Sequence, residues 1–199
     1  MAEKLILLRH GDTGLEYQDR YIGHQDIPMS ESGRRQIEAL TELIRSTGPD
    51  LCVASPLQRC RTAAEIIHNK LNIAVHYDPG LKEVDFGDWE GLSFWEIAAI
   101  WPDQVSQWAR FDSEFSFPGG ESFVDFLYRV KRVADMLVAA PEKNILVCTH
   151  GGVIRSLICH FLRLAPEKYI LFKVRYASLA TLELTGNKGI LAGLNERPF

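Results

Sequence analysis

Two arginines and two histidines of this sequence stand just after apolar stretches of the chain. Arg9 and His10 directly follow the first stretch, Arg59 comes shortly after the second, and His150 follows the third. Guanidinium groups bind phosphate oxygens through paired, charge-assisted hydrogen bonds. An imidazole near neutral pH can attack phosphorus, and a second, protonated imidazole can stabilise charge on the phosphoryl oxygens. These residue types therefore predict binding and transfer of a phosphoryl group.

The three apolar stretches are predicted to be buried parallel strands. They are residues 5–8, 51–54 and 145–148. Each leads into a segment with helical periodicity, which is typical of a parallel sheet covered by helices on both faces. Ligands of such sheets bind beyond the carboxyl ends of the strands. We therefore expect the arginines and histidines to converge on one anion-binding pocket.

The rest of the sequence is consistent with one α/β domain, a three-layer sandwich over residues 1–199. Helices are expected from Ser30 to Gly48, from Pro56 to Leu71 and from Gly151 to about Leu164. Further strands are expected at residues 73–77, 173–174, 179–184 and near 190–191. Residues 93–139 interrupt the alternation with two or three helices, and we interpret them as a helical cap inserted into a mostly parallel sheet.

Composition restricts the class of partner. The net charge of −4 argues against a general nucleic-acid binder, because binding to a phosphate backbone needs an excess of Lys and Arg. No stretch has the length and apolar character of a membrane span. The four cysteines contain no CxxC pair, which favours free thiols in a reducing compartment. We therefore expect a cytoplasmic protein without a membrane partner, and a homodimer is left open.

Glycines and a helix start also favour an anion at the strand ends. Gly11 and Gly151 would let backbone N–H groups approach a ligand closely. The helix that follows would direct its positive end toward the same place. Transfer to a nucleophile then leaves an alkoxide to be protonated, a step to which a positioned carboxylic acid contributes about 10²- to 10⁴-fold.

Five segments resemble, in order, the motifs of the histidine phosphatase superfamily, also called the phosphoglycerate mutase-like family. They are residues 8–13 (LRHGDT), 23–30 (GHQDIPMS), 55–63 (SPLQRCRTA), 81–91 (LKEVDFGDWEG) and 147–152 (VCTHGG). One such motif alone is weak, whereas five in the expected order identify a member of the family. The resemblance implies a phosphatase that needs no metal and no other cofactor.

The resemblance also implies a role for each matching residue. His10 would be the nucleophile that carries the phosphoryl group, and Glu83 would be the proton donor and later the base that activates water. Three residues would hold the phosphoryl group: Arg9, Arg59 and His150. The expected substrate contacts also include Thr13, Gly23 and Gly151.

Two residues depart from the family pattern, and the tryptophans have two interpretations. Asp12 stands where Glu is usual, and Glu16 stands where many members carry an Asn near the phosphate. An acid at position 16 would disfavour doubly charged substrates or would point to solvent. The four tryptophans cluster around the expected cap, where packing is the leading interpretation. The alternative is that Trp89 stacks on an aromatic leaving group.

The expected activity is hydrolysis of a small phosphorylated metabolite. Phosphoglycerate mutases of this family are longer than this compact chain, which favours water as the phosphoryl acceptor. Residues 117–122 (FPGGES) and the overall length resemble α-ribazole phosphatases, which remove a 5′-phosphate from a nucleoside-like substrate. α-Ribazole 5′-phosphate is therefore the leading substrate. A broad-specificity phosphatase and a mutase-type phosphoryl transferase remain as alternatives.

Overall fold

The structure is a computed structural model, and it describes residues 1–110 and 114–197. In these residues a single sheet has the strand order β3-β2-β4-β1-β5-β6. The strands are β1 (Lys4–Arg9), β2 (Leu51–Ala54), β3 (Ala74–Tyr77), β4 (Asn144–Thr149), β5 (Leu179–Thr185) and β6 (Lys188–Glu196). The helices are α1 (Glu31–Thr47), α2 (Gln58–Leu71), α3 (Phe94–Ile100), α4 (Pro102–Ala109), α5 (Phe123–Ala139) and α6 (Gly151–Leu162). The predicted mostly parallel α/β sheet with helices on both faces is confirmed.

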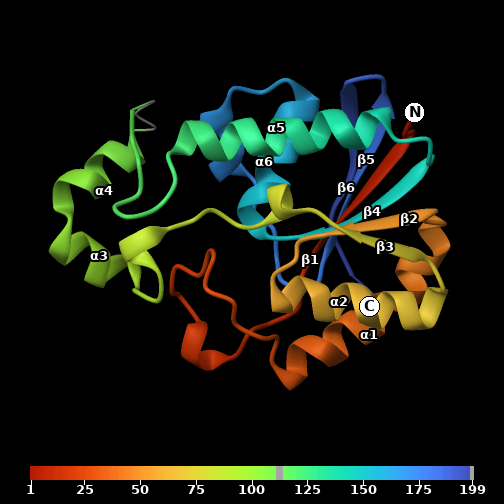
Figure 1. Cartoon of the computed structure of the whole chain (residues 1–199), viewed down its shortest axis with the longest axis horizontal. Coiled ribbons are helices and arrows are strands. Elements are labelled where there is room, and N and C mark those ends of the chain that lie inside the picture. The colour runs from red at the N-terminus through yellow and green to blue at the C-terminus, as the bar shows by residue number, and fades with distance from the viewer. Residues whose placement is uncertain (111–113, 198–199) are drawn as a thin grey trace.

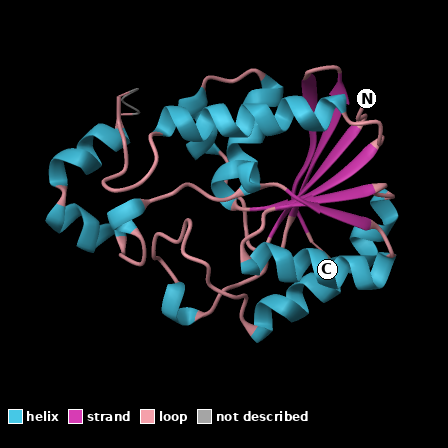
Figure 2. Ribbon diagram, viewed as in Figure 1, coloured by secondary structure: helices cyan, strands magenta, loops and turns pink. Residues whose placement is uncertain are grey.

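The four strands at the centre and one edge of the sheet are parallel, because each is followed by a crossover that buries both of its faces. β1 and β2 both pair with β4 in parallel, and β3 pairs in parallel with β2. Helices α5 and α6 lie on one face and α1 and α2 on the other (Figure 1). The loops that leave the carboxyl ends of these strands run toward α3 and α4 (Figure 2).

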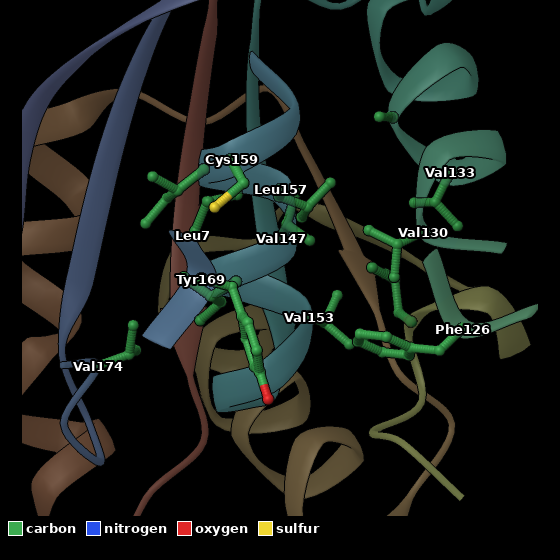
Figure 3. Close-up of a cluster of buried hydrophobic side chains, with 14 of the residues drawn as sticks. Leu7, Phe126, Val130, Val133, Val147, Val153, Leu157, Cys159, Tyr169 and Val174 are labelled. Carbon is green, nitrogen blue, oxygen red and sulfur yellow. The ribbon is translucent and has the colours of Figure 1, made fainter. Parts of the chain in front are cut away.

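Alternating side chains of β1 explain why an uninterrupted apolar strand is needed. Leu5 and Leu7 are fully buried in the cluster under α5 and α6, whereas Ile6 and Leu8 are fully buried in the cluster under α1 and α2. Complete burial contributes about 1.5–3 kcal/mol for each such side chain. Figure 3 shows Leu7 of the sheet in the same cluster as Phe126 of α5. The first strand therefore joins the two halves of the core.

Local signals set the ends of α1. The Ser30 hydroxyl accepts a hydrogen bond from the Gly33 N–H at 3.0 Å, which confirms the expected N-cap. The helix ends where Gly48 adopts a left-handed conformation with φ of 62°. The short helix α3 begins with a capping box in which Ser93 and Glu96 exchange hydrogen bonds.

The expected insertion over residues 93–139 divides into two parts, and its residues 111–113 lie outside the described chain. Helices α3 and α4 stand at the end of the molecule away from the sheet (Figure 1). Helix α5 instead packs on the sheet side, where Phe126, Val130 and Ala134 belong to the main core. The cap is therefore α3 with α4, and α5 is part of the sandwich.

The C-terminal strands are antiparallel. β5 pairs with β1, and β6 pairs with β5 through a bulged register. Residues 173–174, expected as a strand, form none because side chains occupy their carbonyls. The Lys173 carbonyl accepts from Nδ2 of Asn195 at 2.6 Å, and the Val174 carbonyl accepts from Arg9 at 2.7 Å. Across the described residues, no helix is both long and apolar enough to cross a bilayer.

Candidate active site

The carboxyl ends of β1, β2 and β4 bring together the residues expected to bind phosphate. The backbone N–H of His10, just after β1, donates to the carbonyl of Thr149 at the end of β4. The imidazole rings of His10 and His150 then meet edge to face, with centroids 5.2 Å apart. Arg59, on the first turn of α2, donates from Nε to Nδ1 of His150 at 3.3 Å. The predicted convergence of strand ends is present.

A cavity of about 300 Å³ lies over this cluster. Its lining includes five of the predicted residues: Arg9, His10, Thr13, Arg59 and Glu83. His150 lies behind them with 1% of its surface exposed. Two other expected contacts have supporting positions, since the Gly23 carbonyl accepts from Arg59 and Gly151 packs against the Arg9 guanidinium. The expected substrate contacts therefore separate into a lining and a layer behind it.

The tautomer of His10 follows from its partner. Nδ1 lies 2.8 Å from the carbonyl oxygen of Gly11, which can only accept a hydrogen bond. Nδ1 therefore carries the proton, and Nε2 keeps its lone pair. His10 lines the cavity, so this free nitrogen is the atom available to attack a bound phosphorus.

Both histidines are held neutral in the unliganded site. Burial, then the charges of Arg59 and Arg9, lower the pKa of His10 well below its usual value. Burial and Arg59 likewise lower the pKa of His150. The hydrogen bond from Arg59 to Nδ1 leaves the His150 proton on Nε2, which donates to the Ser55 hydroxyl at 2.9 Å. The protonated second imidazole expected from the sequence is thus absent from the empty site, because two guanidiniums already oppose its charge.

These lowered pKa values predict that stability falls in mild acid. Below a pH of about 6.5 the unfolded chain binds protons that the folded His10 and His150 exclude, so the free energy of unfolding falls with pH by about 1.4 kcal/mol per unit for each histidine. We expect His10→Gln to remove one such contribution, measured by urea denaturation between pH 5.5 and 7.5. His76→Gln, at an exposed position, serves as control. A slope unchanged by His10→Gln would contradict a neutral, buried His10.

Arg59 is oriented by a loop that Glu90 holds. Its two terminal nitrogens donate to the carbonyls of Gly23 and Gln25 at 2.6 and 2.8 Å. The N–H groups of Gly23 and His24 donate in turn to the Glu90 carboxylate at 3.0 and 2.7 Å. A Cβ on Gly23 would lie 1.8 Å from the Val84 carbonyl, so only glycine fits this crossing. The second and fourth motifs thus fix the guanidinium of the third.

Arg9 stacks on a tyrosine that the motifs do not include. Its guanidinium carbon lies 3.7 Å from the ring centroid of Tyr176, which also lines the cavity. Tyr176 precedes β5, and the Ala177 N–H donates to the His10 carbonyl. Only the antiparallel pairing of β5 with β1 brings this loop to the site. No local sequence signal reveals that pairing.

The carboxyl group of Glu83 is held at the start of α6. Oε2 accepts from the Gly152 N–H at 3.0 Å, and Oε1 accepts from the Val84 N–H at 3.1 Å. A Cβ on Gly152 would lie 2.4 Å from Oε1, so a larger residue there would displace the acid. The expected positive end of this helix is present, and its Gly152 N–H is directed at Glu83.

An Arg–Glu pair from the start of α5 holds the backbone that carries Glu83. Arg129 and Glu121 form two hydrogen bonds of 2.9 and 2.6 Å. Arg129 also donates to the carbonyls of Gly80, Lys82 and Glu83 at 2.6–2.9 Å. Glu121 also accepts from the backbone N–H two residues beyond Glu83, at 2.8 Å. We call Glu121 and Arg129 the clamp.

The residues around the first motif have structural partners. The Gly11 N–H lies 3.2 Å from the Met29 sulfur, which corrects the expectation that this N–H faces a ligand. The Asp12 carboxylate accepts from the Ser30 hydroxyl at 2.8 Å and from the Gly14 N–H at 3.1 Å. Glu16 is exposed. The Asp12 departure thus ties the first loop to α1.

The tryptophans divide between core and site. Trp89 has no exposed surface and packs edge to face against Trp108 and Phe117. Its burial excludes the alternative that it stacks on a leaving group. Trp108 of α4 instead lines a cavity that borders Glu83. Sequence proximity to Glu83 pointed to the wrong indole, because the fold of the cap decides which one is exposed.

Known proteins resemble this chain in sequence and fold. A bifunctional protein of Mycobacterium tuberculosis is 40% identical over 78% of the chain, which covers only 43% of that protein. A glucosyl-3-phosphoglycerate phosphatase of the same species is 33% identical, covering 82% of this chain and 77% of the relative. The α-ribazole phosphatase of Shigella flexneri superposes with a TM-score of 0.87 at 28% identity, over 98% of this chain and 96% of that one.

The motifs, the site and these similarities agree. The family model that matches describes the histidine phosphatase superfamily (branch 1), and it spans residues 5–197. That span contains all five motifs and every residue placed around the cavity. The chain therefore belongs to the histidine phosphatase superfamily, branch 1.

Proposed function

We propose that this chain hydrolyses a small phosphate monoester through a phosphohistidine on His10. The observation that carries the proposal is the free Nε2 of His10 in a cavity that the guanidiniums of Arg9 and Arg59 and the carboxyl of Glu83 also line. A phosphate bound by the two arginines lies beside a neutral nucleophile. The phosphatases among its relatives support the same reaction class.

In the first step, Nε2 of His10 attacks phosphorus and the bond from phosphorus to the leaving oxygen breaks. The electron pair of that bond goes to the leaving oxygen, which takes the proton of Glu83. Arg9 and Arg59 stabilise the charge on the phosphoryl oxygens. The dianion also raises the pKa of His150, so we assign the protonated form of this ring to the loaded enzyme.

In the second step, water attacks the phosphohistidine and Glu83, now a carboxylate, takes a proton from that water. The bond between phosphorus and nitrogen breaks, its electron pair returns to Nε2, and phosphate leaves. Because the two guanidiniums provide the positive charge for both steps, we propose that no metal takes part. EDTA should leave kcat/KM unchanged, and recovery of activity by an added metal would overturn this part of the proposal.

For the leaving group we propose α-ribazole, so the substrate is α-ribazole 5′-phosphate. The fold of the Shigella flexneri α-ribazole phosphatase, which aligns along nearly the whole chain, supports this choice. The 33% identical relative favours a second candidate, a glycosylated phosphoglycerate. Both substrates are phosphate esters of small alcohols, and the two differ in what is attached to the ester oxygen.

The test is phosphate release, without added metal, from α-ribazole 5′-phosphate, glucosyl-3-phosphoglycerate, nucleotides and 3-phosphoglycerate. We expect kcat/KM for α-ribazole 5′-phosphate to exceed the others by about a hundredfold, a difference of about 2.7 kcal/mol in transition-state binding. A flat, weak profile would retain the chemistry and reject the substrate. Isomerised product without free phosphate would identify a mutase instead.

A further inference from the structure

A second cavity adjoins the active site at Glu83. Its volume is about 260 Å³. Tyr21, Glu83 and Phe86 line both cavities, so the two meet at the proton donor. In the proposed reaction Glu83 protonates the leaving oxygen. Whatever is attached to that oxygen therefore begins at the mouth of this second cavity, which we call the side chamber.

Aromatic rings form the walls of the side chamber. They include Trp108 of α4 and Phe117, and also Phe123 and Tyr169, which lie 5.6 Å apart between centroids. The two rings at the mouth are fixed by edge-to-face contacts, Tyr21 to Trp108 at 5.9 Å and Phe86 to Phe117 at 5.1 Å. Rings held by one another in this way form a preorganised pocket that suits a flat, largely apolar group.

Arg155 is the cation of the side chamber. It lies on α6 one turn beyond Gly152, the residue that holds the Glu83 carboxylate, and both residues line the chamber. Its Nε is buried and, within the part of the chain that the structure describes, has no hydrogen-bond partner. A buried N–H without an acceptor is unfavourable, so a ligand that brings an acceptor gains this bond without breaking another.

We propose that the side chamber binds the leaving group as a planar nitrogen heterocycle, with a ring nitrogen accepting from Nε of Arg155. This inference rests on the phosphatase activity proposed above and names the chemical class of its substrate. The aromatic walls take the faces of the ring, and Arg155 distinguishes it from a hydrocarbon of the same shape. Arg155 is therefore a specificity-determining residue.

The position of Glu83 argues for a neutral ring over an acidic leaving group. Its carboxyl borders the chamber and becomes a carboxylate once it has protonated the leaving oxygen. A leaving group with its own carboxylate would then place two negative charges at the mouth of one small, partly buried chamber, which is unfavourable. A neutral heterocycle satisfies Arg155 without that repulsion.

The experiment compares two substrates that differ only in the ring, α-ribazole 5′-phosphate and ribose 5-phosphate. We expect Arg155→Met to lower the ratio of their kcat/KM values at least tenfold. Arg155→Lys, which keeps the charge and removes Nε, should lower the ratio too and covers the case in which the methionine variant fails to fold. Arg132→Met, at an exposed position on α5, is the matched control and should leave the ratio unchanged.

Free benzimidazole and benzoate probe the chamber without any reaction. Benzimidazole should inhibit hydrolysis of p-nitrophenyl phosphate competitively, and Arg155→Met should raise its Ki at least tenfold. Tighter inhibition by benzoate, or equal losses for both phosphate substrates in the Arg155 variants, would overturn the inference. Arg155-dependent binding of benzimidazole, measured by calorimetry, in a protein that releases no phosphate would instead refute the proposed function and keep the chamber.

Discussion

Replacing His10 by alanine is expected to lower kcat/KM for every phosphate monoester by more than about 10⁴-fold, because no other described side chain presents a free imidazole nitrogen to the cavity. The loss should be the same for good and poor leaving groups. The parent enzyme, quenched within one turnover of ³²P-labelled substrate, should retain an acid-labile label that the variant lacks. Rate and label together test the covalent step.

The control for this substitution is His76→Ala, on the exposed edge strand, which should leave both rate and label unchanged. His10→Ala should still bind vanadate or phosphate, since Arg9 and Arg59 remain. Residual turnover above a few per cent, or a label that survives in the variant, would remove His10 as the nucleophile. Loss of anion binding together with activity would instead indicate a damaged pocket.

Replacing Glu83 by glutamine should produce a loss that depends on the leaving group. An alkyl phosphate needs a proton on its leaving oxygen, so its first turnover should slow by about 10²- to 10⁴-fold. p-Nitrophenolate leaves without protonation, so its first turnover should stay close to that of the parent. The second step still needs the base, and p-nitrophenyl phosphate should therefore give a burst of nitrophenolate followed by slow turnover.

Stopped-flow absorbance resolves that burst, and its amplitude should approach one nitrophenolate per active site. Steady-state rates alone are insufficient, because slow hydrolysis of the phosphohistidine limits both substrates equally. Asp88→Asn serves as the control, a carboxylate in the same motif that does not line the active-site cavity. Equal slowing of the first turnover for both substrates would rule out Glu83 as the proton donor.

Much of the fold follows from the sequence because its signals are local. An apolar run such as residues 5–8 can only be buried on both sides, and Ser30 and Gly48 mark where the next helix starts and stops. Parallel strands then place Arg9, Arg59 and His150 at one edge without further information. Glu83 follows no strand of this kind, and its position was predicted from the family resemblance rather than from periodicity.

The remaining features depend on contacts between distant segments. Tyr176 reaches Arg9 only because β5 runs antiparallel to β1, a pairing that no local periodicity encodes. The neutral state of His150 depends on burial beside Arg59, whereas sequence reasoning considers each side chain in water. Arg155 occupies one position of an ordinary amphipathic helix, and its role depends on the rings that α4 and α5 bring beside it.

The clamp separates the chemistry of this enzyme from its selectivity. Glu121 and Arg129 fasten the segment of Glu83 to α5, which is part of the sandwich, and neither residue lies in α3 or α4. Sequence drift in α3 and α4 can therefore remodel the wall around a leaving group while the acid keeps its distance from the nucleophile. Evolution can diversify substrates on a constant reaction, and a protein engineer could graft a relative's α3 and α4 between residues 93 and 110 with the same expectation.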